Sequence, residues 1–159
     1  MNAAILCVGK MREKFYAAAA DEYLKRISRF GKMEIIEVPD LPEPANASDA
    51  DRQKVIEKEG ESLLSRVKPG DRVIALCIDG PQFESERFAA HLADNDMRFG
   101  SRQVFVIGGS LGLSPAVIRR ADEKMSLSKM SFPHQLARVV LLEQIYRACK
   151  INAGEKYHK

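Results

Sequence analysis

Cysteine is scarce in this sequence, and its three copies are widely separated at positions 7, 77 and 149. An odd number of isolated cysteines, with no C-x-x-C pair, indicates neither a disulfide framework nor a set of zinc ligands. Cys7 and Cys77 lie inside apolar, strand-like runs, where we interpret them as small buried hydrophobic side chains. The pattern favours a reducing compartment and a protein that binds no metal.

Long hydrophobic runs are absent as well. No stretch approaches the roughly 18 consecutive apolar residues that a membrane-spanning helix needs. The opening segment MNAAILCVGK has too short an apolar run for a signal peptide, and its basic residues follow that run instead of preceding it. We therefore expect a soluble, cytoplasmic protein that has no membrane partner.

The glycine signatures of the common nucleotide-binding loops are missing too. The segment GGSLG at 108–112 does not fit G-x-G-x-x-G, and G-x-x-x-x-G-K-[ST] occurs nowhere. No lysine or arginine lies between Ile107 and Pro115 to contact a phosphate. These absences disfavour a nucleotide-dependent oxidoreductase and suit a ligand without a phosphate, such as S-adenosylmethionine.

What the sequence does contain is typical of one globular domain. Of its 159 residues, 45% are hydrophobic and 30% are charged. A chain of this size buries about 70% of its unfolded surface, which is enough to fold without a disulfide or a metal. No internal repeat and no convincing boundary interrupts it, so we assign residues 1–159 to a single domain.

Strand-like and helix-like segments alternate along the chain. The strand-like segments are continuously apolar, which is typical of strands buried on both faces of a parallel sheet. This alternation predicts an α/β fold in which helices cover both faces of a parallel sheet. The predicted strands span residues 3–8, 33–38, 72–78 and 102–107, and the predicted helices span residues 13–30, 49–67, 84–95, 116–123 and 134–151.

Three segments carry residues suited to ligand binding where we expect strands to end. They are ALCIDGP at 75–81, FVIGGSLG at 105–112 and SLSKMSFPH at 126–134. In an open α/β sheet, ligands bind beyond the carboxyl ends of the strands. The pair Gly108-Gly109 allows a ligand to approach the backbone closely, but it also suits a plain tight turn, and both interpretations stay open here.

Positive charge gathers in two regions, although the formal net charge is only +3. Such clusters indicate either contacts with RNA phosphates or ordinary solvated helix faces, and charge alone does not decide between them. The first region contains Lys10, Arg12, Lys14, Lys25, Arg26, Arg29 and Lys32, and the second contains Arg138, Arg147, Lys150, Lys156 and Lys159.

The order and spacing of four segments resemble those of a known family. The segments are VGKMREKFY at 8–16, FVIGGSLGLS at 105–114, SLSKMSFPHQLARVVLLEQIYRA at 126–148 and GEKYHK at 154–159. Together they are similar to the SPOUT-class methyltransferases that modify N3 of a pseudouridine in 23S ribosomal RNA, the ribosomal RNA large subunit methyltransferase H family. The likeness spans essentially the whole chain.

The resemblance implies a fold, a cofactor and partners. The family has a deep, C-terminal trefoil knot, binds S-adenosylmethionine in the knot loops, and acts as an obligate homodimer on 23S rRNA within the ribosome. A non-catalytic module that binds RNA or the ribosome remains the alternative. Carried over by motif, the expected cofactor contacts are Leu76, Gly108, Leu127, Ser128, Lys129, Met130, Ser131 and Phe132.

The resemblance also bears on the predicted last helix, residues 134–151, which is apolar on most of its sides. A helix of this kind must be buried on most sides, so one core-facing stripe does not account for it. We expect the protein's own core on one side and a partner subunit on the other. The apolar side chains are Leu136, Val139, Val140, Leu142, Ile145, Tyr146 and Cys149.

Four residues are candidates for catalysis: His134, Arg138, Tyr157 and His158. Methylation of an imide nitrogen requires loss of its proton and in-line approach to the methyl group, so positioning is expected to supply most of the acceleration. A nearby base would accept that proton, or a nearby cation would stabilise the anion that forms. The alternative for His134 is a structural cap of the last helix, and for the KYHK tail it is a frayed end. The resemblance instead implies that the terminal Tyr-His pair lies beside the cofactor of a partner subunit.

Overall fold

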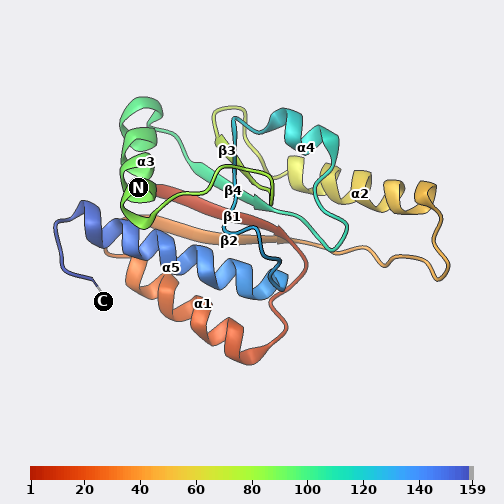
Figure 1. Ribbon diagram of the computed structural model, residues 1–159, viewed down its shortest axis with the longest axis horizontal. Coiled ribbons are helices and arrows are strands. Elements are labelled where there is room, and N and C mark those ends of the chain that lie inside the picture. The colour runs from red at the N-terminus through yellow and green to blue at the C-terminus, as the bar shows by residue number, and fades with distance from the viewer. Residues whose placement is uncertain (158–159) are drawn as a thin grey trace.

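A computed structural model describes residues 1–157 of the chain. Five parallel strands form one sheet in the order β2-β1-β4-β3-β5, with five helices around it (Figure 1). The parallel α/β fold predicted from the sequence is confirmed. The strands are β1 (Asn2–Val8), β2 (Lys32–Val38), β3 (Arg72–Leu76), β4 (Gln103–Ile107) and β5 (Glu123–Met125), and the helices are α1 (Lys14–Ile27), α2 (Asp49–Leu64), α3 (Ser85–Phe99), α4 (Pro115–Arg120) and α5 (His134–Asn152).

The central strand β1 shows why the sheet is covered on both faces. Its residues after Asn2 are all buried, and Ile5 lies between Ile35 of β2 and Phe105 of β4. Alternate side chains of a strand point to opposite faces. The residues Ile5 and Cys7 therefore belong to a core beneath α1, α3 and α5, whereas Leu6 packs in a second core beneath α2 and α4.

Local signals in the sequence set where several helices begin and end. The Ser48 hydroxyl accepts a hydrogen bond from the backbone N–H of Asp51, whose carboxylate accepts one in return from Ser48, and this capping box starts α2. The Ser114 hydroxyl and Pro115 start α4. Helix α3 ends at Gly100, which has φ of 57°.

Strand β5 was missed by the sequence analysis, and the predicted helix over 116–123 was too long. Helix α4 ends at Arg120, and Glu123–Met125 then pairs with β3 as an edge strand. Three residues are too few to show any periodicity, which explains why the segment EKM gave no strand signal.

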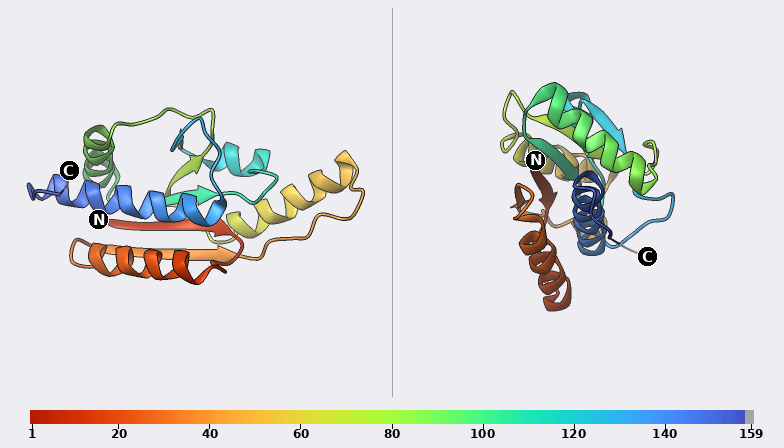
Figure 2. Two further views of the ribbon diagram at one scale, coloured as in Figure 1. Left: turned by 60° about the horizontal axis from the view of Figure 1, so that its bottom comes forward. Right: turned by 90° about the vertical axis from the view of Figure 1, so that its left-hand side faces the viewer.

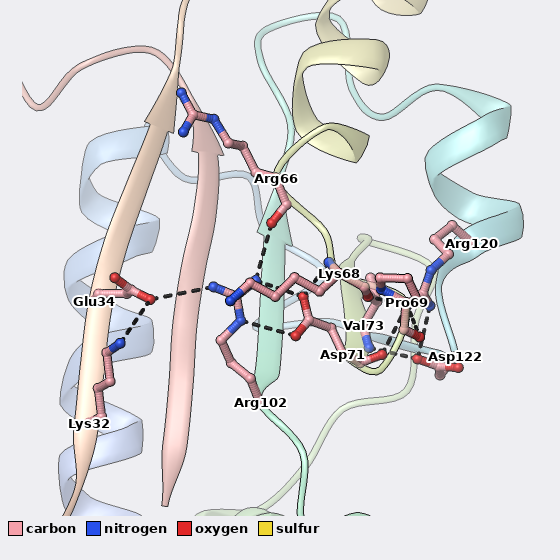
Figure 3. Close-up of polar contacts among 10 residues, drawn as sticks. All are labelled: Lys32, Glu34, Arg66, Lys68, Pro69, Asp71, Val73, Arg102, Arg120 and Asp122. Carbon is pink, nitrogen blue, oxygen red and sulfur yellow. Dashed lines mark hydrogen bonds and ion pairs between the residues drawn. The ribbon is translucent and has the colours of Figure 1, made fainter.

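A buried ion pair ties the amino ends of the strands together (Figure 3). The Arg102 guanidinium donates to Asp71 at 2.7 Å, and the side chains of Asp71 and Arg102 are only 4% and 11% exposed. Arg102 also reaches Glu34 of β2 at 3.4 Å and the carbonyl of Arg66 at 3.1 Å. Desolvation acts to raise the pKa of Asp71, but hydrogen bonds from Arg102 and the Lys68 backbone N–H outweigh it, so the pKa is lowered.

Helix α5 crosses one face of the sheet beside α1 and α3 and runs against the strand direction (Figures 1 and 2). It begins near the carboxyl ends of the strands and finishes at the other end of the molecule, where the N-terminus also lies. Among the described residues, no helix is long and apolar enough to cross a membrane.

Candidate active site

A cavity of about 520 Å³ lies at the carboxyl ends of β3, β4 and β5. The three segments singled out in the sequence, which follow these strands, form most of its wall, and the start of α5 completes it. Each expected cofactor contact except Lys129 lines this cavity. The lining contacts are Leu76, Gly108, Leu127, Ser128, Met130, Ser131 and Phe132.

The glycine turn after β4 is closed tightly on itself. The backbone N–H of Gly112 donates to the carbonyl of Gly109 at 3.0 Å, and Gly112 has φ of 87°. A Cβ placed on Gly108 would lie 2.8 Å from the carbonyl carbon of Gly112 and 3.1 Å from a methyl carbon of Leu113. The segment is therefore both a tight turn and a wall of the cavity, and no side chain fits at position 108 without moving it.

The loop after β3 lies directly over β5 and the segment that follows it. The backbone N–H of Cys77 donates to the carbonyl of Met125 at 2.8 Å, and that of Ser126 donates to Pro81 at 2.9 Å. A Cβ on Gly80 would lie 2.8 Å from the backbone of Met125. This close contact fixes the segments around 77 and 127, which both line the cavity, relative to each other.

The described residues that line the cavity include no Lys, Arg, Asp or Glu. Its polar groups are serine hydroxyls, backbone atoms, the Cys77 thiol and the His134 imidazole. The Ser128 hydroxyl accepts from the backbone N–H of Met130 at 3.0 Å, and Ser126 donates to the carbonyl of Ser128 at 2.9 Å, so the loop is internally ordered. Burial raises the pKa of Cys77, which keeps its thiol protonated.

His134 is the first residue of α5 and lines the cavity. Burial, and then the positive charge of Arg138, lower the pKa of this histidine from its ordinary value of 6.5. The imidazole is therefore neutral at pH 7 and is able to accept a proton. Pro133 is the N-cap residue, and no side-chain hydrogen bond caps the helix, so the capping interpretation of His134 has no support.

Arg138 does not line the cavity, although it lies one turn after His134. Its side chain is only 1% exposed, donates to the carbonyl of Val8 at 2.6 Å and lies 3.8 Å from the Glu37 carboxylate. Its Nε and Nη1 atoms have no hydrogen-bond partner among the described residues. Arg138 thus ties the first turns of α5 to the ends of β1 and β2.

Tyr157 packs against the middle of α5, over Glu143, Tyr146 and Arg147, and does not line the cavity. Its ring packs edge-on against Tyr146 at 4.8 Å between centroids, and its hydroxyl lies 3.4 Å from Glu143. Burial is the main reason why the pKa of Tyr157 is raised. Tyr146, on which the Tyr157 ring packs, lies roughly 18 Å along the helix from His134, so one chain does not bring Tyr157 to its own cavity. His158 lies outside the described residues.

Several lining residues were not among the predicted contacts. Most of them lie within the segments that the sequence analysis singled out for ligand binding, although they were not named as cofactor contacts. They include Cys77, Ile78, Gly109, Ser110, Gly112 and Leu113. In residues 1–157, no three His, Cys, Asp or Glu side chains gather as a metal-binding group.

Comparisons with known proteins agree with this geometry. The family described as "Predicted SPOUT methyltransferase" matches residues 1–158. The chain belongs to the SPOUT methyltransferase family. Among its relatives are proteins named "Ribosomal RNA large subunit methyltransferase H" from Bifidobacterium animalis subsp. lactis, Clostridium novyi and Bacillus cereus, which are 54%, 52% and 51% identical to it. Each match covers 100% of both chains.

Solved structures of other methyltransferases share the fold of this SPOUT family member. A probable methylase family protein from Haemophilus influenzae matches with a TM-score of 0.56 and 12% identity, covering 99% of this chain and 70% of that chain. A probable methyltransferase from Bordetella pertussis matches with a TM-score of 0.55 and 14% identity, covering 93% and 94%. At such low identity these likenesses concern the fold alone.

Proposed function

We propose that this protein is an S-adenosylmethionine-dependent methyltransferase that acts on N3 of a pseudouridine in 23S rRNA of the large ribosomal subunit. The observation that carries the proposal is the uncharged cavity at the carboxyl ends of β3, β4 and β5, lined by the segments that follow these strands. Relatives more than 50% identical over the full chain, named for methylation of large-subunit ribosomal RNA, support this choice of substrate.

The cavity suits S-adenosylmethionine in size and in charge. Its volume of about 520 Å³ lies within the range of ordinary ligand pockets. Apolar walls from Leu76, Leu127 and Phe132 fit an adenine ring and a methionine chain, and the bare backbone at Gly108 gives close access to main-chain atoms. The absence of lysine and arginine from the described lining disfavours ATP and NAD, whose phosphates would find no cationic side chain there.

The chain's own residues position the target base and accept its proton. When bound, S-adenosylmethionine provides an electrophilic methyl group on a sulfonium. We assign to His134, which lines the cavity and is neutral because its pKa is lowered, the role of accepting the N3 proton of the target base. Arg138 contributes by holding the first turns of α5, which carry His134, against β1. In this proposal Tyr157 stacks on the unpaired base, and His158 orients or deprotonates that base.

A homodimer is part of this proposal, because Tyr157 lies far from the cavity of its own chain. No side chain of α5 from residues 135 to 151 is fully exposed even in the single chain. Leu142, Ile145 and Cys149 belong to the chain's own core, and Tyr146 is covered by Tyr23, Phe30 and Tyr157, whereas Leu136, Val139 and Val140 are only half-buried. We assign this second group to the partner interface, through which each tail reaches the partner's cavity.

We also propose that the segment from β4 to α5 forms the trefoil knot of the family. Supporting this, the loop after β3 crosses tightly over Met125 and Ser126, and the chain then returns to the opposite side of the molecule as α5. A glycine at position 80 permits this crossing, since a Cβ there would meet backbone atoms at 2.8 Å.

Calorimetric titration with S-adenosylmethionine, ATP and NAD tests the cofactor assignment. Binding of S-adenosylmethionine alone is the expected result. Failure to bind it, with ribosome binding retained, would overturn the proposal in favour of a non-catalytic RNA-binding module. Binding of NAD in its place would indicate an oxidoreductase.

A further inference from the structure

The segment after α5 folds back over the helix instead of extending from it. The backbone N–H of Gly154, where φ is 70°, donates to the carbonyl of Ile151 at 3.0 Å. The next N–H, that of Glu155, donates to the carbonyl of Lys150 at 2.9 Å. These bonds complete the exposed end of α5 and turn the chain so that residues 155–157 lie back along α5.

The carboxylate of Glu155 is held by two cations from different parts of the chain. Arg29, which follows α1, and Lys150 near the end of α5 both donate to the same oxygen. The hydrogen bond from Lys150, followed by that from Arg29, holds the pKa of Glu155 below its usual value. Charge-assisted hydrogen bonds from two directions fix a side chain more firmly than one flexible pair.

Tyr157, two residues later, rests on a surface made of aromatic and arginine side chains. The Arg147 guanidinium lies over its ring at 4.7 Å, and Tyr146 packs against its edge. Tyr146 in turn contacts Tyr23 and Phe30 at 6.2 and 6.3 Å between centroids. The aromatic surface on which Tyr157 rests is therefore anchored in the packing of α1 against α5.

We propose that Glu155 is a positioning residue that holds Tyr157 ready for the partner's active site. The inference rests on the proposed function, in which Tyr157 stacks on the target base. A short tail without the contacts to Arg29 and Lys150 samples many arrangements. Only the fraction of molecules in which the tail packs along α5 presents the Tyr157 ring to the partner's cavity. The contacts of Glu155 raise that fraction before the substrate arrives, and they leave S-adenosylmethionine binding untouched because the cavity lies at the other end of α5.

The test compares Glu155→Gln, which keeps the size and removes the charge, with wild-type protein. Glu61→Gln is the matched control, because Glu61 is exposed on α2 and none of its side-chain atoms takes part in a hydrogen bond or ion pair among the described residues. A third protein ends at Ala153 and shows how much methyl-transfer activity is lost when the whole tail is missing. Methyl transfer to ribosomes, the KM for S-adenosylmethionine, the melting temperature, sedimentation and the rate of carboxypeptidase digestion are measured for each.

For Glu155→Gln we expect kcat to fall by about fivefold, the scale of a modest ion-pair contribution, and carboxypeptidase to shorten the tail faster. The KM for S-adenosylmethionine and the sedimentation coefficient should match those of wild type and Glu61→Gln. A merely structural role would instead lower the melting temperature and change KM together with kcat.

Two outcomes would overturn the inference, and they differ in what they leave standing. If Glu155→Gln transfers methyl groups at the wild-type rate while the protein ending at Ala153 is inactive, Glu155 has no positioning role and the proposed function survives. If the protein ending at Ala153 is itself fully active, the catalytic role of the tail fails, and the role of Glu155 fails with it.

Discussion

Replacement of Gly108 by alanine is the sharpest perturbation of the cofactor site. The added Cβ would lie 2.8 Å from the carbonyl carbon and 2.9 Å from the carbonyl oxygen of Gly112, and both residues line the cavity. Backbone atoms at such a distance must move, because they cannot rotate away as the end of a flexible side chain does. The glycine turn therefore opens, and the wall that it forms shifts by several tenths of an ångström or more.

The size of the effect follows from the cost of overpacking. Forcing an extra carbon into a closely packed site costs about 1–3 kcal/mol. If restoring the bound geometry of the turn carries that cost, the affinity for S-adenosylmethionine falls by about 5- to 140-fold, since each 1.4 kcal/mol is roughly a factor of ten. We expect the chain to retain its fold, because Gly108 lies in the turn beyond β4 and belongs to neither apolar core.

The assay is calorimetric titration of Gly108→Ala with S-adenosylmethionine, with thermal unfolding as a check on folding. Gly70→Ala is the matched control, because a Cβ there meets no atom within 4 Å and the residue lies in the turn before β3, far from the cavity. The control should bind as wild type does. Wild-type affinity in a folded Gly108→Ala protein would refute the assignment of this turn to the cofactor site.

Three further predictions concern stability, assembly and substrate binding. Asp71→Asn should lower the free energy of unfolding, measured in urea, by about 2–3 kcal/mol, because it leaves buried Arg102 without its main charged partner. The pKa of Asp71 is lowered in the folded protein. Its stabilising contribution is therefore present above the ordinary carboxyl pKa and is lost as the pH falls through the lowered value. An unchanged urea midpoint would contradict this. Val140→Asp should yield folded monomers in sedimentation, whereas a wild-type monomer at micromolar concentration would remove the proposed interface. Ribosome binding should weaken steeply with salt, and Lys10→Gln should reduce the salt slope by about one; a slope of zero for the wild type would exclude phosphate contacts.

The sheet and the cavity segments were predictable because their signals are local. Continuous apolar runs at 3–8 and 102–107 mark buried strands, and the ends of parallel strands meet at one edge. The position of Leu142 was not predictable in the same way. An apolar helix pattern does not tell a core residue from an interface residue, and Leu142 is 0% exposed within its own chain. A charge at Leu142 would therefore test folding and not dimerisation.

The charged residues of α5 show a second limit of sequence reasoning. Charged side chains ordinarily lie at the surface, yet Arg138 is buried by contacts with Val8 and Glu37. Likewise, nothing near Glu155 in the sequence points to Arg29, which lies 126 residues away. Interactions between such distant residues depend on the complete fold, and for this reason the docked tail resembled a frayed end in the sequence.

Transfer of a labelled methyl group from S-adenosylmethionine to ribosomes is the most direct test of the proposed activity. Purified wild-type protein should label 23S rRNA of the large subunit, and the label should map to N3 of a pseudouridine. Gly108→Ala should label it more slowly at limiting S-adenosylmethionine, while Gly70→Ala should match wild type. Absence of label at saturating S-adenosylmethionine, or label confined to another RNA or to ribosomal protein, would contradict the proposed function.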